Sequence, residues 1–174
     1  MVLGYQIVLI DFQPFADSAQ MLYGGPWVAE RLAILQDFLA THPPDQFPDI
    51  DATVYGIIQG GDKYDAVSVF QAIYRLAELQ RATEQQWQQM DILAVPTTGT
   101  IYSIAEVQAS PLQLNSNLGL YTNFVNLLDL SAISIPNGFQ QNGLPTGLTL
   151  IASAWQEPQL CQIGTLMVQN QDDA

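Results

Sequence analysis

Side chains able to bind an anion are scarce in this 174-residue sequence, which has four lysine and arginine residues against 17 acids. Arg31 is the one whose surroundings suggest a site. It follows Trp27 and precedes Leu35 at four-residue spacing, so it would project near the apolar face of a helix, early enough for the helix dipole to favour an anion. A guanidinium can hold a carboxylate through two parallel hydrogen bonds, and the hydroxyl of Tyr23 could join it. The alternative is that Arg31 pairs with a nearby acid or extends along the edge of the core.

Polar side chains in two other segments are candidate pocket residues. Thr97 and Thr98 follow a predicted strand, at the end where α/β folds gather ligand groups. Asn115 precedes a predicted helix on which Thr122 and Asn126 share a face, so these three could line or order a pocket. The alternative, that they cap or satisfy backbone groups, is the commoner role of such side chains.

The sequence gives no indication of a metal or a cofactor. Its histidine, cysteine and acidic residues lack metal-ligand spacing, and its glycines match neither phosphate-loop pattern. The one histidine, His42, lies beside two prolines in a predicted loop and is expected to be neither ligand nor base. We therefore expect neither a metal nor a cofactor.

Charge and hydropathy narrow the range of partners. The formal net charge is −13, which would repel phosphate backbones, so nucleic acid and anionic membranes are not expected partners. The longest apolar stretches, such as residues 148–154, are too short to span a bilayer, and the N-terminus does not look like a signal peptide. A cytoplasmic location is the resulting expectation. Cys161 is the only cysteine, so no intramolecular disulfide can form.

Hydrophobic periodicity predicts strands that alternate with helices. Ile7, Val8 and Ile10 favour a first strand, a Gly-Gly-Pro break separates two early helices, and Asp62 is a candidate N-cap for the longest helix. Phe70 belongs to the predicted inward face of that helix, together with Ala66, Ile73, Ala77 and Leu79. The predicted strands are 3–12, 92–95, 133–135 and 148–152. The predicted helices are 14–22, 26–41, 53–59, 64–90, 104–109, 118–128 and one beginning at 158.

This alternation indicates an α/β fold with a largely parallel or mixed β-sheet flanked by helices. The length fits one domain, residues 1–174. Only four strands are predicted, and the first begins almost at Met1, which is unusual for a complete domain.

Two segments resemble a known family. Residues 22–31, LYGGPWVAER, and residues 115–130, NSNLGLYTNFVNLLDL, resemble the C-terminal part of amidase-signature enzymes in their allophanate hydrolase form. The second match continues through Ile135-Pro136 and residues 143–150, GLPTGLTL. Residues 91–97, DILAVPT, are similar to a strand-to-loop passage common to amidases at large. Together the matches span nearly the whole chain.

The resemblance implies a partial amidase-signature fold and cofactor-free hydrolysis of allophanate or a related amide to ammonia and CO₂. It assigns substrate binding to Tyr23 and Arg31. The family's serine nucleophile, cis-peptide serine and lysine base lie upstream of everything matched, and this sequence contains no Ser-Ser pair. Its only lysine, Lys63, lies in a Gly-Gly-Asp-Lys loop unlike the family's lysine strand. No residue here is therefore expected to be catalytic, and the chain alone is predicted to be inactive.

Two functions remain open. The chain could complete a hydrolase together with a separate polypeptide that carries the lysine and the serines. It could instead be a non-catalytic remnant or a binding module for a small carboxylate, self-associating to cover a cut sheet. The predicted partners are accordingly a small carboxylate or amide ligand, and either a chain with the N-terminal half of an amidase or a second copy of this one.

Overall fold

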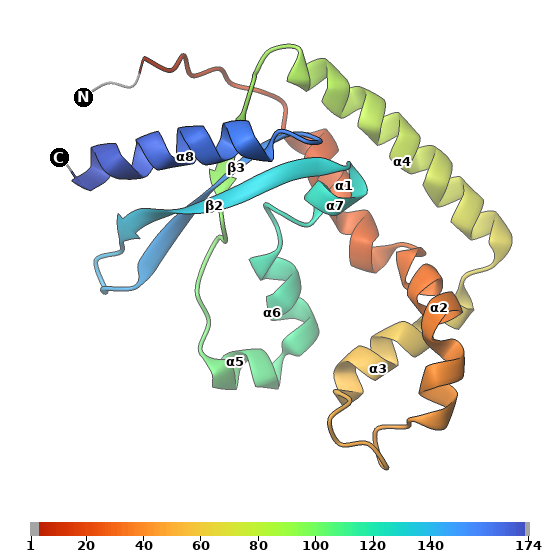
Figure 1. The fold of residues 1–174 in the computed structure, drawn as a ribbon. Coiled ribbons are helices and arrows are strands. Elements are labelled where there is room, and N and C mark those ends of the chain that lie inside the picture. The colour runs from red at the N-terminus through yellow and green to blue at the C-terminus, as the bar shows by residue number, and fades with distance from the viewer. Residues whose placement is uncertain (1–3, 173–174) are drawn as a thin grey trace.

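The computed structural model describes residues 4–172, and within them three strands form one antiparallel sheet (Figure 1). The strands are β1 (Leu93–Pro96), β2 (Leu130–Phe139) and β3 (Pro145–Ser153), in the order β1-β3-β2. Leu93 pairs with Ile151 in the β1–β3 register. The predicted strands at 92–95, 133–135 and 148–152 are thus confirmed, and the last two extend further than the sequence indicates.

The α/β class is confirmed, but the sheet is antiparallel where a largely parallel or mixed one was expected. A short turn causes this for β2 and β3: the Gln140 amide donates to the Leu144 carbonyl at 2.8 Å, and Gly143 adopts φ +81°. Such a turn returns the chain beside itself and forms a hairpin. β1 then pairs antiparallel with the other edge of β3.

Helices cover both faces of the sheet. α8 (Glu157–Asp172) packs on one face, where Leu160 contacts a cluster with Leu150 and Ala152 of β3. The opposite face holds Ile151 of β3, which packs with Phe15 of α1 (Gln13–Gly24) and other residues of the larger core cluster. Successive residues of β3 therefore point to opposite layers, as the pleat of a strand requires. The other members of the larger cluster are Ala19, Leu93, Val95, Phe124 and Leu128.

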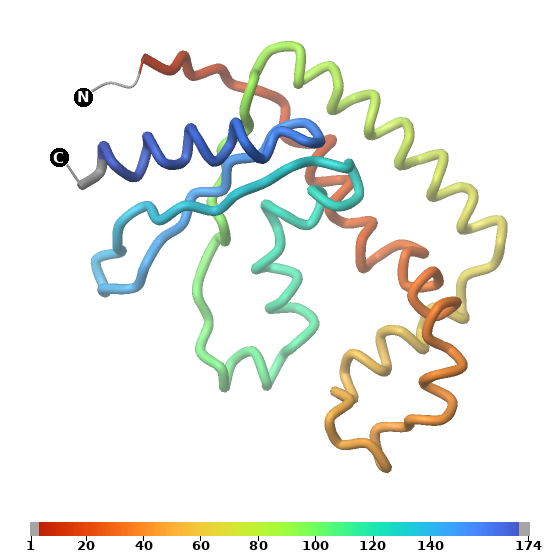
Figure 2. Tube along the Cα trace, viewed as in Figure 1, coloured from red at the N-terminus to blue at the C-terminus, as the bar shows by residue number. Residues whose placement is uncertain are grey.

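A helical arm extends from α1 away from the sheet (Figure 2). It contains α2 (Trp27–Thr41), α3 (Ala52–Gln59) and the 3₁₀ helix Gly60–Lys63, which packs on α2. Gly61 permits this approach, because a Cβ there would lie 2.7 Å from the Val28 carbonyl oxygen and 2.9 Å from the Ala29 Cα. The break predicted between the first two helices is confirmed at Gly25, where a Cβ would lie 2.6 Å from the Met21 carbonyl oxygen.

The longest helix, α4 (Ala66–Trp87), begins later than predicted. Asp65, not Asp62, is its N-cap, because Gly60–Lys63 forms a separate 3₁₀ turn. The Asp65 carboxylate accepts from the Ser68 amide at 2.7 Å and the Ser68 hydroxyl at 2.6 Å.

The inward face predicted for α4 is also wrong. Leu79 is buried, but Phe70 is 56% exposed and Ile73 is 47% exposed. Ala66 and Ala77 are exposed as well. The reason is that α1 packs against α4 through the side that carries Leu76 and Leu79, and no described element lies on the other side (Figure 1).

The N-terminal segment is not a strand as far as it is described. Leu3, the first residue of that prediction, lies outside the described residues. Residues 4–12 have no regular secondary structure and pair with neither β1 nor β2, the two edge strands of the sheet. Ile7 and Leu9 are 90% and 94% exposed, whereas Ile10 and Phe12 pack against the larger core cluster. The β-branched residues favour a strand, but no described strand lies beside this segment to pair with it.

The segment from 104 to 128 is more broken than predicted. α5 (Ile104–Ala109) has the predicted bounds, and a capping box between Ser103 and Glu106 explains where it begins. α6 (Pro111–Leu118) ends before Gly119, and α7 (Phe124–Leu127) is a single turn. The predicted helix 118–128 is therefore largely a turn.

Candidate functional site

A cavity of about 630 Å³ lies where the end of α1 faces the end of α6. Its walls come from two segments distant in sequence, the second half of α1 with the Gly24–Gly25 break and the stretch from α6 to α7. Four side chains with hydrogen-bonding groups line it outside the body of α1. Tyr23 lies next to the break, and Ser116, Asn117 and Asn123 lie on the second segment. The remaining lining residues are Ala16, Asp17, Ala19, Gln20, Met21, Gly24, Gly25 and Leu120.

Tyr23 and Arg31, the two predicted substrate-binding residues, are brought together beside this cavity. Tyr23 lines it from the last turn of α1, and the guanidinium carbon of Arg31 lies 5.4 Å from the centroid of the Tyr23 ring. Arg31 is half-buried and makes no ion pair with any carboxylate among residues 4–172. The Gly-Gly-Pro break turns α2 so that its second turn meets the end of α1. The guanidinium hydrogens are thus left for another acceptor.

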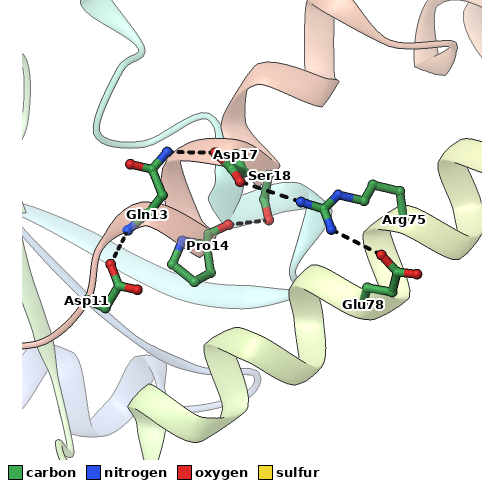
Figure 3. A network of polar contacts seen from close by, with 7 residues as sticks. All are labelled: Asp11, Gln13, Pro14, Asp17, Ser18, Arg75 and Glu78. Carbon is green, nitrogen blue, oxygen red and sulfur yellow. Dashed lines mark hydrogen bonds and ion pairs between the residues drawn. The ribbon is translucent and has the colours of Figure 1, made fainter.

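The cavity wall on α1 contains a carboxylate that is already engaged (Figure 3). Asp17 accepts from the Gln13 side-chain amide at 2.7 Å and pairs with Arg75 of α4 at 3.6 Å. The same guanidinium bonds Glu78 at 3.0 Å. Arg75 therefore offsets part of the negative charge at this wall, which would otherwise repel an anionic ligand.

The opposite wall is ordered by side-chain amides. Asn117 donates to the Tyr102 hydroxyl at 3.0 Å and accepts from Gln113 at 3.1 Å. Asn123 sits against Gly119, where a Cβ would overlap the Asn123 side-chain amide. This glycine thus leaves the space that the Asn123 amide occupies at the cavity edge.

The other predicted pocket residues do not line this cavity. Thr97 bonds the hydroxyls of Ser134 at 2.8 Å and Thr149 at 2.9 Å, and so ties β1 to the hairpin. Thr98 donates to the Thr100 carbonyl at 3.1 Å.

Asn115 donates to the Pro111 carbonyl one turn back along α6, at 2.7 Å, which is the backbone-satisfying role weighed as its alternative. Thr122 precedes α7 in a turn, while Asn126 lies within α7, so the expected common helix face is not formed. Asn126 is exposed.

Sequence reasoning missed several lining residues. Ser116 and Asn117 directly follow Asn115 in the motif of residues 115–130, so their position is recognisable from the sequence. Asn123 likewise follows Thr122. Asp17 gave no signal, because an acid on an amphipathic helix is usually solvated; only the spatial meeting of α1 and α6 reveals it.

Other candidate chemistry is not assembled in the described part of the chain. Lys63 is exposed, with its ammonium 4.9 Å from the centroid of the Tyr64 ring. His42 stacks on Phe38 at 4.2 Å between ring centroids. Residues 4–172 contain no cluster of three or more histidine, cysteine or acidic side chains placed to hold a metal. None of the described helices is both long and apolar enough to cross a membrane.

A sequence model of the Amidase family matches residues 3–161. The chain therefore belongs to the amidase family. Within that family it is similar to the urea amidolyase of Lachancea kluyveri, with 41% identity over 162 residues, and to that of Saccharomyces cerevisiae, with 38% over 167 residues. These matches cover 93% and 96% of this chain, but the chain spans only 9% of the length of either relative.

Solved structures agree with this. The allophanate hydrolase of Kluyveromyces lactis superposes with a TM-score of 0.86 and 39% identity, over 92% of this chain and 26% of that one. The resemblance to allophanate hydrolases and the partial amidase-signature fold are thereby confirmed. A vestigial protein complex connected with an s-triazine catabolic enzyme shares the fold over 97% of this chain, with a TM-score of 0.70 at 20% identity.

Proposed function

We propose that this chain supplies the substrate-binding side of an allophanate hydrolase-like amidase site. The substrate is allophanate or a related small amide that carries a carboxylate, and hydrolysis yields ammonia and CO₂. Tyr23 and Arg31 orient the carboxylate, and the catalytic serines and lysine come from residues outside this sequence. The proposal includes a cytoplasmic location.

One observation carries the proposal: the Arg31 guanidinium lies over the Tyr23 ring beside the cavity without a described acid partner. Arg81 and Lys63 also make no ion pair among residues 4–172, but both are exposed, whereas Arg31 is half-buried. The cation–π contact restrains the guanidinium and leaves its N–H groups available for a bidentate bond to a carboxylate. Half-burial strengthens such a bond relative to a fully solvated one.

The division of labour follows from the chemistry of amide hydrolysis. A nucleophile adds to the amide carbonyl, the C–N bond breaks as the nitrogen is protonated, and water then releases the acyl group. Arg31 and Tyr23 act on the carboxylate end and hold the carbonyl in place for attack. Lys63, the only lysine of this sequence, is exposed and stacked over Tyr64, which makes it unsuited to serve as the base.

The open N-terminal segment supports a complementary polypeptide, either separate or continuous with this one. Ile7 and Leu9 are almost fully exposed, and residues 4–10 have no regular secondary structure and no described strand beside them. An apolar segment outside helices and strands can become extended and join a sheet. We propose that the part with the serines and the lysine contributes the neighbouring strand.

A binding measurement tests the site directly. Malonamate replaces the central N–H of allophanate by CH₂ and cannot decarboxylate in the same way, while malonamide is its neutral counterpart. We expect malonamate to bind and malonamide not to bind, as measured by calorimetry or NMR titration. Arg31→Ala should abolish the binding, whereas Arg81→Ala, which removes an exposed arginine of α4, should leave it unchanged.

A second measurement tests the complementary part. The protein purified gently from its own cells is expected to elute with a polypeptide that carries a Ser-Ser segment and a lysine, and that complex should release ammonia. Malonamate binding without any such polypeptide would instead identify a non-catalytic carboxylate-binding module. Equal binding by wild type and Arg31→Ala would refute the proposed site in either form.

A further inference from the structure

We propose that Asn142, at the tip of the β2–β3 hairpin, is a site of spontaneous deamidation. This modification is independent of the proposed amidase site. The sequence contains two Asn-Gly pairs, Asn137–Gly138 and Asn142–Gly143, and both lie in this hairpin. Glycine after asparagine favours the reaction, because a residue without a Cβ leaves its backbone nitrogen accessible to the asparagine side chain. The surroundings of the two pairs differ, and only those of Asn142 favour the chemistry.

The reaction closes a ring between the Asn142 side chain and the next peptide unit. The Gly143 nitrogen loses its proton to solvent and its electron pair forms a bond to the Asn142 Cγ, while the C=O pair moves onto Oδ1. That pair returns as the Cγ–Nδ2 bond breaks, and the nitrogen leaves as ammonia with a proton from water. One water molecule then opens the cyclic imide at either carbonyl and gives aspartate or isoaspartate.

A hydrogen bond keeps the reacting groups of Asn142 and Gly143 together. The Leu144 amide donates to the Asn142 Oδ1 at 3.1 Å. The ring that this bond closes contains both the Asn142 Cγ and the Gly143 nitrogen, so the two atoms that must join are held near each other. The donor is also directed at the oxygen on which negative charge develops in the tetrahedral intermediate, and it stabilises that charge.

The turn around Asn142 is open to solvent. Asn142 and Gly143 are both exposed, and Gly143 has a φ of +81°. The Gly143 amide donates to the Gln140 carbonyl at 2.9 Å. This bond must break before the nitrogen attacks, but it is at the surface, where water can replace it at little net cost.

Asn137 provides an internal comparison. It lies in β2, and the Thr146 hydroxyl of β3 donates to the carbonyls of both Asn137 and Gly138. The peptide unit between Asn137 and Gly138 is thereby tied to the neighbouring strand. Attack by the Gly138 nitrogen requires this peptide to turn away from β3, so local opening of the hairpin should slow the reaction at Asn137.

Peptide mapping by mass spectrometry tests the proposal on the wild-type protein. The folded protein is incubated at mildly alkaline pH, and deamidation at the two asparagines is followed over time. Asn142 should react at least about tenfold faster than Asn137. It should yield both aspartate and isoaspartate, because only the cyclic imide leads to isoaspartate. In concentrated urea the two rates should become similar, since both asparagines precede glycine.

Two variants serve as controls. Asn142→Gln keeps a side-chain amide but would have to close a larger ring, so it should remove the fast reaction and the ammonia released with it. Asn137→Gln should leave both unchanged. Equal rates at Asn137 and Asn142 in the folded protein overturn the proposal, and so does a faster reaction at Asn137. Aspartate without isoaspartate at Asn142, or a rate difference that persists in urea, overturns it as well.

Discussion

Arg31 and Tyr23 meet across a helix break: the guanidinium carbon lies 5.4 Å from the centroid of the tyrosine ring, although the two residues belong to different helices. The contact exists because Gly25 ends α1 in an extended conformation and Pro26 precedes α2. The arrangement holds the Arg31 guanidinium over the Tyr23 ring beside the cavity, with no described acid partner.

Removing the Tyr23 ring should leave the Arg31 guanidinium less well positioned to bind a carboxylate. Tyr23→Leu is expected to weaken malonamate binding by about two- to fivefold, the equivalent of an exposed cation–π contact of about 0.5–1 kcal/mol. Tyr23→Phe keeps the ring, so any loss with that variant measures the hydroxyl alone. Calorimetric titration of the three proteins gives both quantities, and equal affinity for all three would contradict a role of Tyr23 in orienting Arg31.

Adding a methyl group at Gly119 should move Asn123. A Cβ at this position overlaps the end of the flexible Asn123 side chain and no backbone atom, so Gly119→Ala should change the unfolding free energy by less than about 1 kcal/mol. The side-chain amide resonance of Asn123 should shift clearly in an NMR spectrum. Gly60→Ala, which meets nothing within 4 Å, serves as the control and should leave that resonance in place.

The hydroxyls at the β1–β3–β2 junction should be worth measurable stability. Thr97→Val removes the partner of the buried Thr149 hydroxyl and is expected to lower the free energy of unfolding by about 1–3 kcal/mol. Thr165→Val removes an exposed hydroxyl that bonds only the Cys161 carbonyl of α8, and should cost less than about 0.5 kcal/mol. Denaturant unfolding gives the loss of unfolding free energy for each variant. A similar loss in both would contradict a stabilising role of the Thr97 hydroxyl at the junction.

The close approach of α2 and the 3₁₀ helix should depend on Gly61. Gly61→Ala places a Cβ against fixed backbone atoms of Val28 and Ala29, so a loss of about 1–3 kcal/mol is expected. Gly56→Ala, in open space on α3, should stabilise the protein by about 0.4–1 kcal/mol. Opposite signs in thermal unfolding are the expected result; a neutral Gly61→Ala would mean that the arm moves freely to admit the methyl group.

The capping box of α5 should show a dependence on pH. Hydrogen bonds from the Ser103 hydroxyl and amide lower the pKa of Glu106 below 4.5. A lowered folded-state pKa means that the stabilisation is complete above the unfolded value and is lost as the pH falls through the folded one. Ser103→Ala should raise the Glu106 pKa toward 4.5, as measured by carboxyl NMR titration. An unchanged titration would show that the cap is not populated in solution.

Several elements of the fold are predictable from the sequence because local chemistry determines them. α5 has a capping box, the α1–α2 break has two glycines and a proline, and β3 is apolar on both faces because both are covered. The direction of strand pairing and the orientation of α4 are not local properties. Phe70 and Leu79 are both apolar, and only the packing of α1 decides which of them is buried.

The candidate site also combines residues that a local motif predicts with residues that only tertiary packing brings in. Tyr23 and Arg31 are recognisable because a short motif holds both, and the structure brings them together. Asp17 and Asn123 join the cavity through the meeting of α1 with the α6–α7 region, more than ninety residues away in the chain, a distance that no local pattern spans. The pocket roles expected for Thr97, Thr98, Asn115, Thr122 and Asn126 remain predictions.

The strand order has a consequence for how the chain reaches its native state. β2 and β3 are joined by a five-residue turn and can zip together within microseconds, whereas β1 must find β3 across a loop of about fifty residues. We expect the hairpin, with α8 docked on it, to form early and the pairing of Leu93 with Ile151 to limit the folding rate. Substitutions that weaken the hairpin or β1 should then slow folding, while those in contacts that form after this pairing should mainly speed unfolding.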